Sequence, residues 1–161
     1  MIQAYLVSSK FAKNYDLKLS KSQKKDSVVR LHIITSERVN TSFELKYGQF
    51  ESNVFEKACP KDKKPLLKFI MHGFAETWQM SFRWNWIDSM IDEMFKNPEA
   101  SKLCVIVVDW KELANGGKLI SNYWKAISNM RIAGDLITEF FRVNPIQEKN
   151  MHCIGFSLGK L

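Results

Sequence analysis

The sequence predicts an α/β fold, with a mostly parallel sheet and flanking helices. Short apolar runs rich in β-branched residues alternate with two longer stretches in which apolar residues recur every three or four positions. Near-continuous apolar runs are typical of strands covered on both faces, and the longer spacing is typical of amphipathic helices. The order strand, helix, strand, helix, strand calls for right-handed crossovers, which make successive strands parallel.

The strands are predicted from their apolar patterns. In "VVRLHIIT", residues 28–35, apolar side chains alternate with Arg30 and His32, which indicates a strand with one partly solvated face. Near-continuous apolar runs predict three further strands, and a shorter one is expected around "SFELKYG". The three runs are "LLKFIM" (66–71), "LCVIVV" (103–108) and "MHCI" (151–154).

Two helices are predicted between these strands. The first carries apolar residues from Trp84 to Phe95 and is expected to end at Asn97-Pro98, because proline disfavours a helical conformation in the preceding residue. In the second, apolar residues recur in steps of four and three from 123 to 141. Ser121 is placed to cap its start, and Asn144-Pro145 to stop it.

Composition indicates one domain, residues 27–161, preceded by a polar basic extension, residues 1–26, with little fixed structure. The net charge of +7 comes largely from lysines in the first 68 residues. A solvated basic surface accounts for it, and attraction to an anionic membrane surface or a polyanion is the alternative. The basic residues accompany no nucleic-acid-reading motif, so nucleic-acid binding is not expected. We expect no transmembrane segment, and the N-terminus lacks the pattern of a secretion signal.

The three cysteines, Cys59, Cys104 and Cys153, have no metal-ligand spacing. Cys104 and Cys153 lie inside apolar runs, where a cysteine is usually a small buried hydrophobe. They do not indicate a cellular compartment, and the sequence predicts neither a metal nor a cofactor.

Each of the three apolar runs leads into a distinctive cluster. The clusters are His72-Gly73-Phe74, Asp109-Trp110 and the G-x-S-x-G pattern of residues 155–159. Because the carboxyl ends of parallel strands meet at one edge of a sheet, we expect all three clusters on the same rim, where ligands of such sheets bind.

The G-x-S-x-G pattern predicts a nucleophile elbow at Ser157. The serine of such an elbow sits on a strained strand-to-helix turn, and Gly155 and Gly159 leave room that side chains would fill. The backbone N–H of Leu158 can then donate to a developing oxyanion, and the N–H of Phe74 fits the second donor.

Together these marks resemble the pancreatic-lipase-related family of α/β-hydrolases, which includes secreted triacylglycerol lipases and phospholipases A1. The resemblance runs from about Val28 to Gly159 and rests on "VRLHIITSE", "KFIMHGF", "VIVVDW", "NYWKAISNMRIAGDLITEFF" and "HCIGFSLG". It implies that Ser157 is the nucleophile and that the N–H groups of Phe74 and Leu158 form the oxyanion hole. It further implies a lipid ester at a lipid–water interface as substrate, and an extracellular location.

The chain departs from the family at two places. Phe156 stands where members usually carry histidine, and Lys160-Leu161 follows where they continue with Ala-His. The family's acid and base come later in its sequence, whereas all three histidines here precede Ser157. In this fold the acid follows the serine, so Asp109 is interpreted as structural.

The hypothesis from the sequence is therefore an α/β-hydrolase truncated just after the nucleophile elbow, inactive as a fragment. One alternative is a non-catalytic lipid-binding or storage protein on a lipase-like fold. Another is an unrelated α/β esterase or thioesterase. The sequence does not indicate the substrate-binding residues, the choice between triglyceride and phospholipid, or the oligomeric state.

Overall fold

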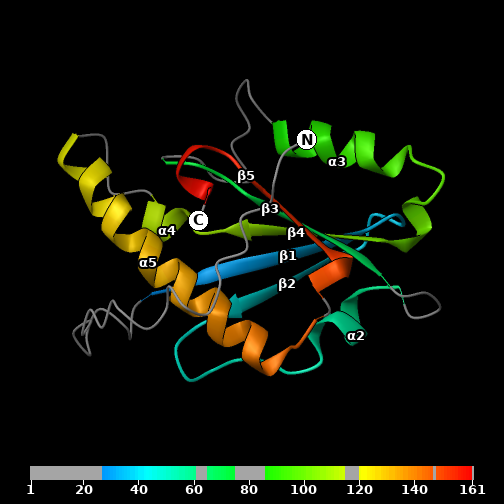
Figure 1. Cartoon of the computed structure of the whole chain (residues 1–161), viewed down its shortest axis with the longest axis horizontal. Coiled ribbons are helices and arrows are strands. Elements are labelled where there is room, and N and C mark those ends of the chain that lie inside the picture. Colours follow the sequence, from blue (N-terminus) through cyan, green and yellow to red (C-terminus); the bar gives the residue numbers. More distant parts are fainter. Residues whose placement is uncertain (1–26, 61–64, 75–85, 115–119, 147, 161) are drawn as a thin grey trace.

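The chain folds around a five-stranded sheet (Figure 1). The computed structural model describes residues 27–60, 65–74, 86–114, 120–146 and 148–160. The strand order is β2-β1-β4-β3-β5. These strands are β1 (Val29–Thr35), β2 (Asn40–Leu45), β3 (Leu66–Met71), β4 (Leu103–Asp109) and β5 (Met151–Gly155).

The sheet is mixed, which corrects the prediction of a mostly parallel one. Strands β3, β4 and β5 run parallel, whereas β1 is antiparallel to both β2 and β4. The reason is local, because the link of residues 36–39 between β1 and β2 is long enough only for a hairpin. Strand β3 runs in the same direction as β2, because β2 and β4 are both antiparallel to β1 and β3 is parallel to β4.

Helices cover both faces of the sheet. The longer ones are α3 (Trp86–Phe95) and α5 (Ile120–Val143). Alternate residues of β4 contact opposite helices: Ile106 belongs to the core under α5, and Val107 to the core under α3. The shorter elements are α2 (Val54–Ala58), α4 (Lys111–Ala114), η1 (Ala100–Lys102), η2 (Glu148–Asn150) and η3 (Ser157–Gly159).

The C-terminal ends of the two long helices lie where the sequence predicted them. Helix α3 ends at Phe95, just before Asn97-Pro98 as predicted, while Trp84 lies outside the described residues. Helix α5 ends at Val143, where Asn144 accepts a hydrogen bond from the Val54 N–H at 3.0 Å.

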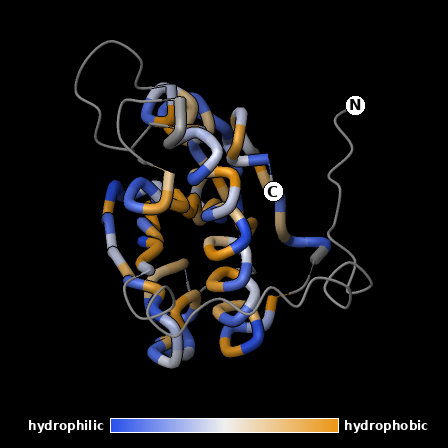
Figure 2. The backbone as a smooth tube through the Cα atoms, turned by 90° about the vertical axis from the view of Figure 1, so that its left-hand side faces the viewer, coloured by the Kyte–Doolittle hydropathy of each residue, from blue (hydrophilic) through white to orange (hydrophobic). Residues whose placement is uncertain are grey.

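The predicted cap of the second helix is wrong. Ser121 lies inside α5, whose described part already begins at Ile120. A serine is only a weak marker of a helix start, because a neighbouring turn of helix can incorporate it at little cost in free energy. Figure 2, in which α5 faces the viewer, shows hydrophobic and hydrophilic residues alternating along that helix, as the predicted periodicity requires.

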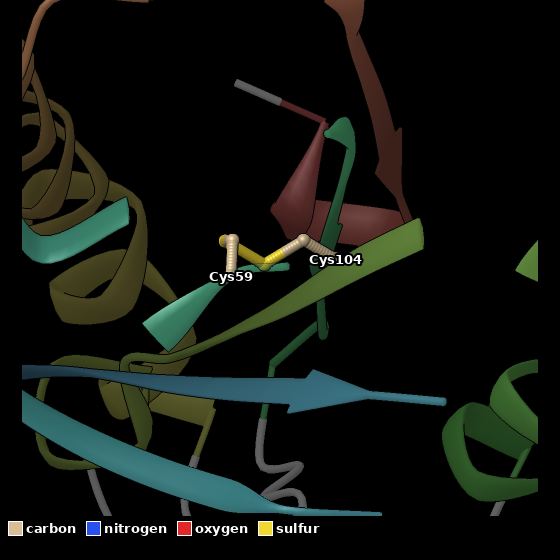
Figure 3. The surroundings of a disulfide bond; sticks show 2 residues. All are labelled: Cys59 and Cys104. Atoms are coloured by element: carbon tan, nitrogen blue, oxygen red, sulfur yellow. A yellow bond between two sulfur atoms is a disulfide. The ribbon is translucent and has the colours of Figure 1, made fainter. Parts of the chain in front are cut away.

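A disulfide joins Cys59, at the end of α2, to Cys104, at the start of β4 (Figure 3). Cys104 is buried, as its apolar surroundings in the sequence indicated, but its disulfide was not predicted. Cys153 is a free thiol in β5 and is exposed, not buried as its apolar surroundings in the sequence indicated. Spacing alone did not reveal the pair, since 45 residues separate the two cysteines and only the crossover from β2 to β3 brings them together.

Candidate active site

The turn after β5 has the strained geometry expected of a nucleophile elbow. Ser157 has φ +52°, a left-handed conformation that non-glycine residues rarely adopt. Ser157 is exposed to solvent. A hydrogen bond from the Gly159 N–H to the Phe156 carbonyl, at 2.8 Å, closes the turn. Strain of this kind persists only where the surrounding structure enforces it, and it often marks a functional position.

Close packing of the backbone requires glycine at both flanking positions. A Cβ on Gly155 would lie 2.3 Å from the carbonyl oxygen of Gly159. A Cβ on Gly159 would lie 2.4 Å from the carbonyl oxygen of Met71 and 2.6 Å from that of His72. The collision predicted from the sequence is therefore present, and for Gly159 the colliding atoms belong to the end of β3 and the residue after it.

The same packing brings two of the three predicted clusters together. The Phe156 N–H donates to the Met71 carbonyl at 3.0 Å, and Gly159 lies against the backbone of Met71 and His72. The loop that continues from His72 to Phe74 thus begins beside the elbow. Leu158, whose N–H is the other predicted donor, packs against the core under α5.

The third cluster lies at the same edge of the sheet and binds the first. His72 is fully buried, and its Nε2 lies 3.1 Å from Oδ1 of Asp109. The indole Nε1–H of Trp110 donates to the His72 carbonyl at 2.8 Å, and the two rings stack with centroids 5.9 Å apart. The three loops therefore share one rim, as the sequence predicted.

Asp109 is a buried carboxylate surrounded by donors. Burial raises the pKa of Asp109, but hydrogen bonds from His32, from His72 and from the Lys111 N–H outweigh burial and hold that pKa well below its ordinary value. The Nε2 atom of His32 lies 3.8 Å from the other carboxylate oxygen of Asp109. This agrees with the interpretation of Asp109 as structural. The part played by His32 was missed, because a histidine on the polar side of a strand pattern gives no sign of a partner.

Each of the three histidines of the chain contacts the side chain of a residue other than Ser157. His72 contacts Asp109, and His32 lies between Ser42 and Asp109. His152 contacts Lys68 at 3.0 Å, and its pKa is lowered by burial and by that ammonium group. It lies five residues before Ser157 on an extended strand, a span of roughly 16 Å.

Aromatic side chains lie next to the two oxyanion segments. The Phe74 ring contacts Tyr123 edge-on at 5.2 Å, and the exposed Phe156 ring contacts Trp86 at 5.6 Å between centroids. Trp124, two-thirds exposed, continues the first pair along α5. An apolar group bound at this rim would find aromatic surface on either face of the sheet.

A serine on a strained elbow, packed against the end of β3 and the start of the loop that follows it, is an arrangement suited to acyl transfer. The sequence matches the family model "Lipase" over residues 6–160. The chain belongs to the Lipase family. The match begins inside the predicted extension, residues 1–26, which lies outside the described residues.

Membership of the Lipase family supports the resemblance noted from the sequence, and it places the chain among hydrolases of lipid esters. A comparison with curated proteins gave no match. Within the part of the chain that the structure describes, no helix is long and apolar enough to cross a membrane. No group of acidic, histidine and cysteine side chains in those same segments is arranged to hold a metal ion.

Proposed function

We propose that the chain carries the nucleophile and the oxyanion hole of a carboxylic ester hydrolase acting on lipids, of the triacylglycerol lipase or phospholipase A1 type. Ser157 is the nucleophile, and the N–H groups of Phe74 and Leu158 form the oxyanion hole. The observation that carries the proposal is the positive φ of Ser157, enforced between two glycines that no other residue can replace without a backbone collision.

The reaction is transfer of an acyl group. The Ser157 hydroxyl attacks the ester carbonyl, a base takes the hydroxyl proton, and the negative charge that develops on the carbonyl oxygen is stabilised by the two backbone N–H groups. The alcohol leaves with a proton, and water then hydrolyses the acyl-serine. Phe74, Tyr123 and Phe156 offer apolar contact to an acyl chain next to the serine.

The proposal includes low activity for residues 1–161 alone. Each of the three histidines contacts another side chain, and a serine hydroxyl without a base is a weak nucleophile. We also propose an extracellular location for the protein. The Cys59–Cys104 disulfide supports it, since such bonds persist mainly in oxidising compartments.

A small base added to the solution should restore the missing step. With 4-nitrophenyl butyrate as substrate, residues 1–161 and Ser157→Ala should differ less than about twofold without added base, because oxyanion stabilisation alone leaves only trace activity. Imidazole, which can reach the exposed Ser157, should add a rate that rises with its concentration in the wild type only. Hydrolysis by imidazole itself is subtracted through the Ser157→Ala variant.

Three results would go against the proposal. Equal rates for the wild type and Ser157→Ala at every imidazole concentration would exclude Ser157 as the nucleophile. Wild-type turnover far above Ser157→Ala without imidazole would show that a base is already present. Stoichiometric binding of a lipid without turnover dependent on Ser157 would favour the alternative of a lipid-binding protein.

A further inference from the structure

The buried contact between Asp109 and His72 lies directly behind the predicted oxyanion loop. The two side chains come from neighbouring parallel strands, at 4% and 0% exposure, and they meet where β4 and β3 end. Burying a carboxylate costs several kcal/mol unless donors surround it, and an apolar pair of similar size is often at least as stable. A contribution to the stability of the fold therefore does not explain why Asp109 and His72 are paired at this position.

Asp109 and the backbone N–H of Trp110 both hold the His72 ring at its Nε2 atom, to which the Trp110 N–H donates at 3.2 Å. One carboxylate oxygen accepts the Lys111 N–H at 3.0 Å and lies 3.1 Å from His72 Nε2. The other ring nitrogen of His72 lies 3.0 Å from the carbonyl oxygen of Gly73. The ring thus joins the carboxylate to the backbone of the next residue along the loop, one peptide before Phe74.

The backbone of His72 is held from two further sides. Trp110 donates its indole N–H to the His72 carbonyl at 2.8 Å. Gly159 packs so closely against the same carbonyl that an added Cβ would lie 2.6 Å from it. The elbow and the loop therefore share one anchor point, and the direction of the Phe74 N–H depends on how that point is held.

We propose that Asp109 is a positioning residue for the oxyanion hole. Through the His72 ring, and with the indole of Trp110, it sets the backbone of Gly73 and Phe74 relative to Ser157. This inference rests on the proposed function, because it assigns a purpose to the loop in acyl transfer. It gives Asp109 no contact with substrate and no part in proton transfer.

The test compares Asp109→Asn with Glu112→Gln. Asparagine keeps the size of the side chain and removes its charge. Glu112 is a matched control: it lies three residues later, is exposed, and pairs with Arg30 at 2.6 Å. Two readouts are measured in each variant of the full chain: the NMR order parameter of the Phe74 N–H, and the imidazole-dependent rate of Ser157 acylation by 4-nitrophenyl butyrate.

Asp109→Asn should lower the Phe74 order parameter from about 0.85 to below about 0.6, the range of a flexible backbone. It should slow acylation about 10- to 100-fold at saturating ester, because a donor displaced by about 1 Å can cost that much. The apparent KM for the ester should stay unchanged, since the oxyanion hole acts in the transition state. Glu112→Gln should match the wild type in both readouts.

The proposal is overturned if Asp109→Asn keeps both the wild-type order parameter and the wild-type acylation rate. It is also overturned if amides throughout β4 become as flexible as Phe74, because the effect is then a general loss of packing. If Asp109→Asn does not fold, Trp110→Phe decides: it keeps an aromatic ring and removes the indole donor, and it should shift both readouts in the same direction. Unchanged readouts in Trp110→Phe would then reject the proposal.

The two proposals can fail separately. Absence of Ser157 acylation in the wild type would contradict the proposed function. The Phe74 order parameter would still show whether Asp109 holds the loop.

Discussion

Replacing Cys59 and Cys104 with alanine should lower the free energy of unfolding by about 4 kcal/mol, as the entropy of closing a loop of 45 residues predicts. Domains of this size are stable by only about 5–15 kcal/mol, so the loss is a large fraction of the total. Urea denaturation followed by tryptophan fluorescence measures it. Cys153→Ala, which removes the exposed free thiol, is the control and should change stability by less than about 0.5 kcal/mol.

A double alanine variant that lost less than about 1 kcal/mol would contradict the expected constraint. The disulfide ties α2 to the start of β4, next to the buried residues under α5. We therefore expect its loss to loosen the end of the sheet opposite to the candidate active site. The rim, where β3, β4 and β5 end, should keep its structure longest.

The second large effect is expected at Gly159. Gly159→Ala should destabilise the fold by about 3 kcal/mol, because its Cβ would lie 2.4 Å from a backbone carbonyl that cannot rotate away. The matched control is Gly134→Ala in α5, where nothing lies within 4 Å of the added Cβ. That variant should instead stabilise the protein by roughly 0.5–1 kcal/mol, the usual preference of a helix for alanine.

Urea denaturation of both variants gives the comparison directly. Opposite signs for the two substitutions would show that the backbone packing at the elbow, and not glycine's flexibility, sets the requirement for glycine. A Gly159→Ala variant as stable as the wild type would mean that the elbow can move away from the end of β3. In that case the serine and the Phe74 loop would no longer be held in register.

The parts of this structure that follow from local pattern were predictable from sequence. Strand β4 is buried on both faces, and its unbroken run of apolar residues predicted this. The strained turn at Ser157 was expected from the G-x-S-x-G pattern, because a Cβ on Gly155 would collide with backbone only a few residues away. The collision at Gly159 involves the end of the neighbouring strand β3, which the pattern does not identify.

What could not be predicted depends on the route of the chain through space. The antiparallel direction of β1 relative to β2 and β4 follows from the hairpin between β1 and β2, which leaves no clear periodic pattern in the sequence. The Cys59–Cys104 pair joins residues 45 apart in the sequence, so it depends on the fold and not on local pattern. The placement of His72 at the rim was expected, but its burial against Asp109 needed the relative position of two strands.

Labelling of Ser157 tests the central claim most directly. A 4-nitrophenyl alkylphosphonate, in the presence of imidazole, should form a bond from Ser157 Oγ to phosphorus while 4-nitrophenolate leaves and imidazole takes the proton. Peptide mass spectrometry should find one label per chain, on Ser157, in the wild type and in Ser128→Ala, which removes an exposed hydroxyl on α5. Labelling spread over other residues, or equal labelling of Ser157→Ala, would contradict the account.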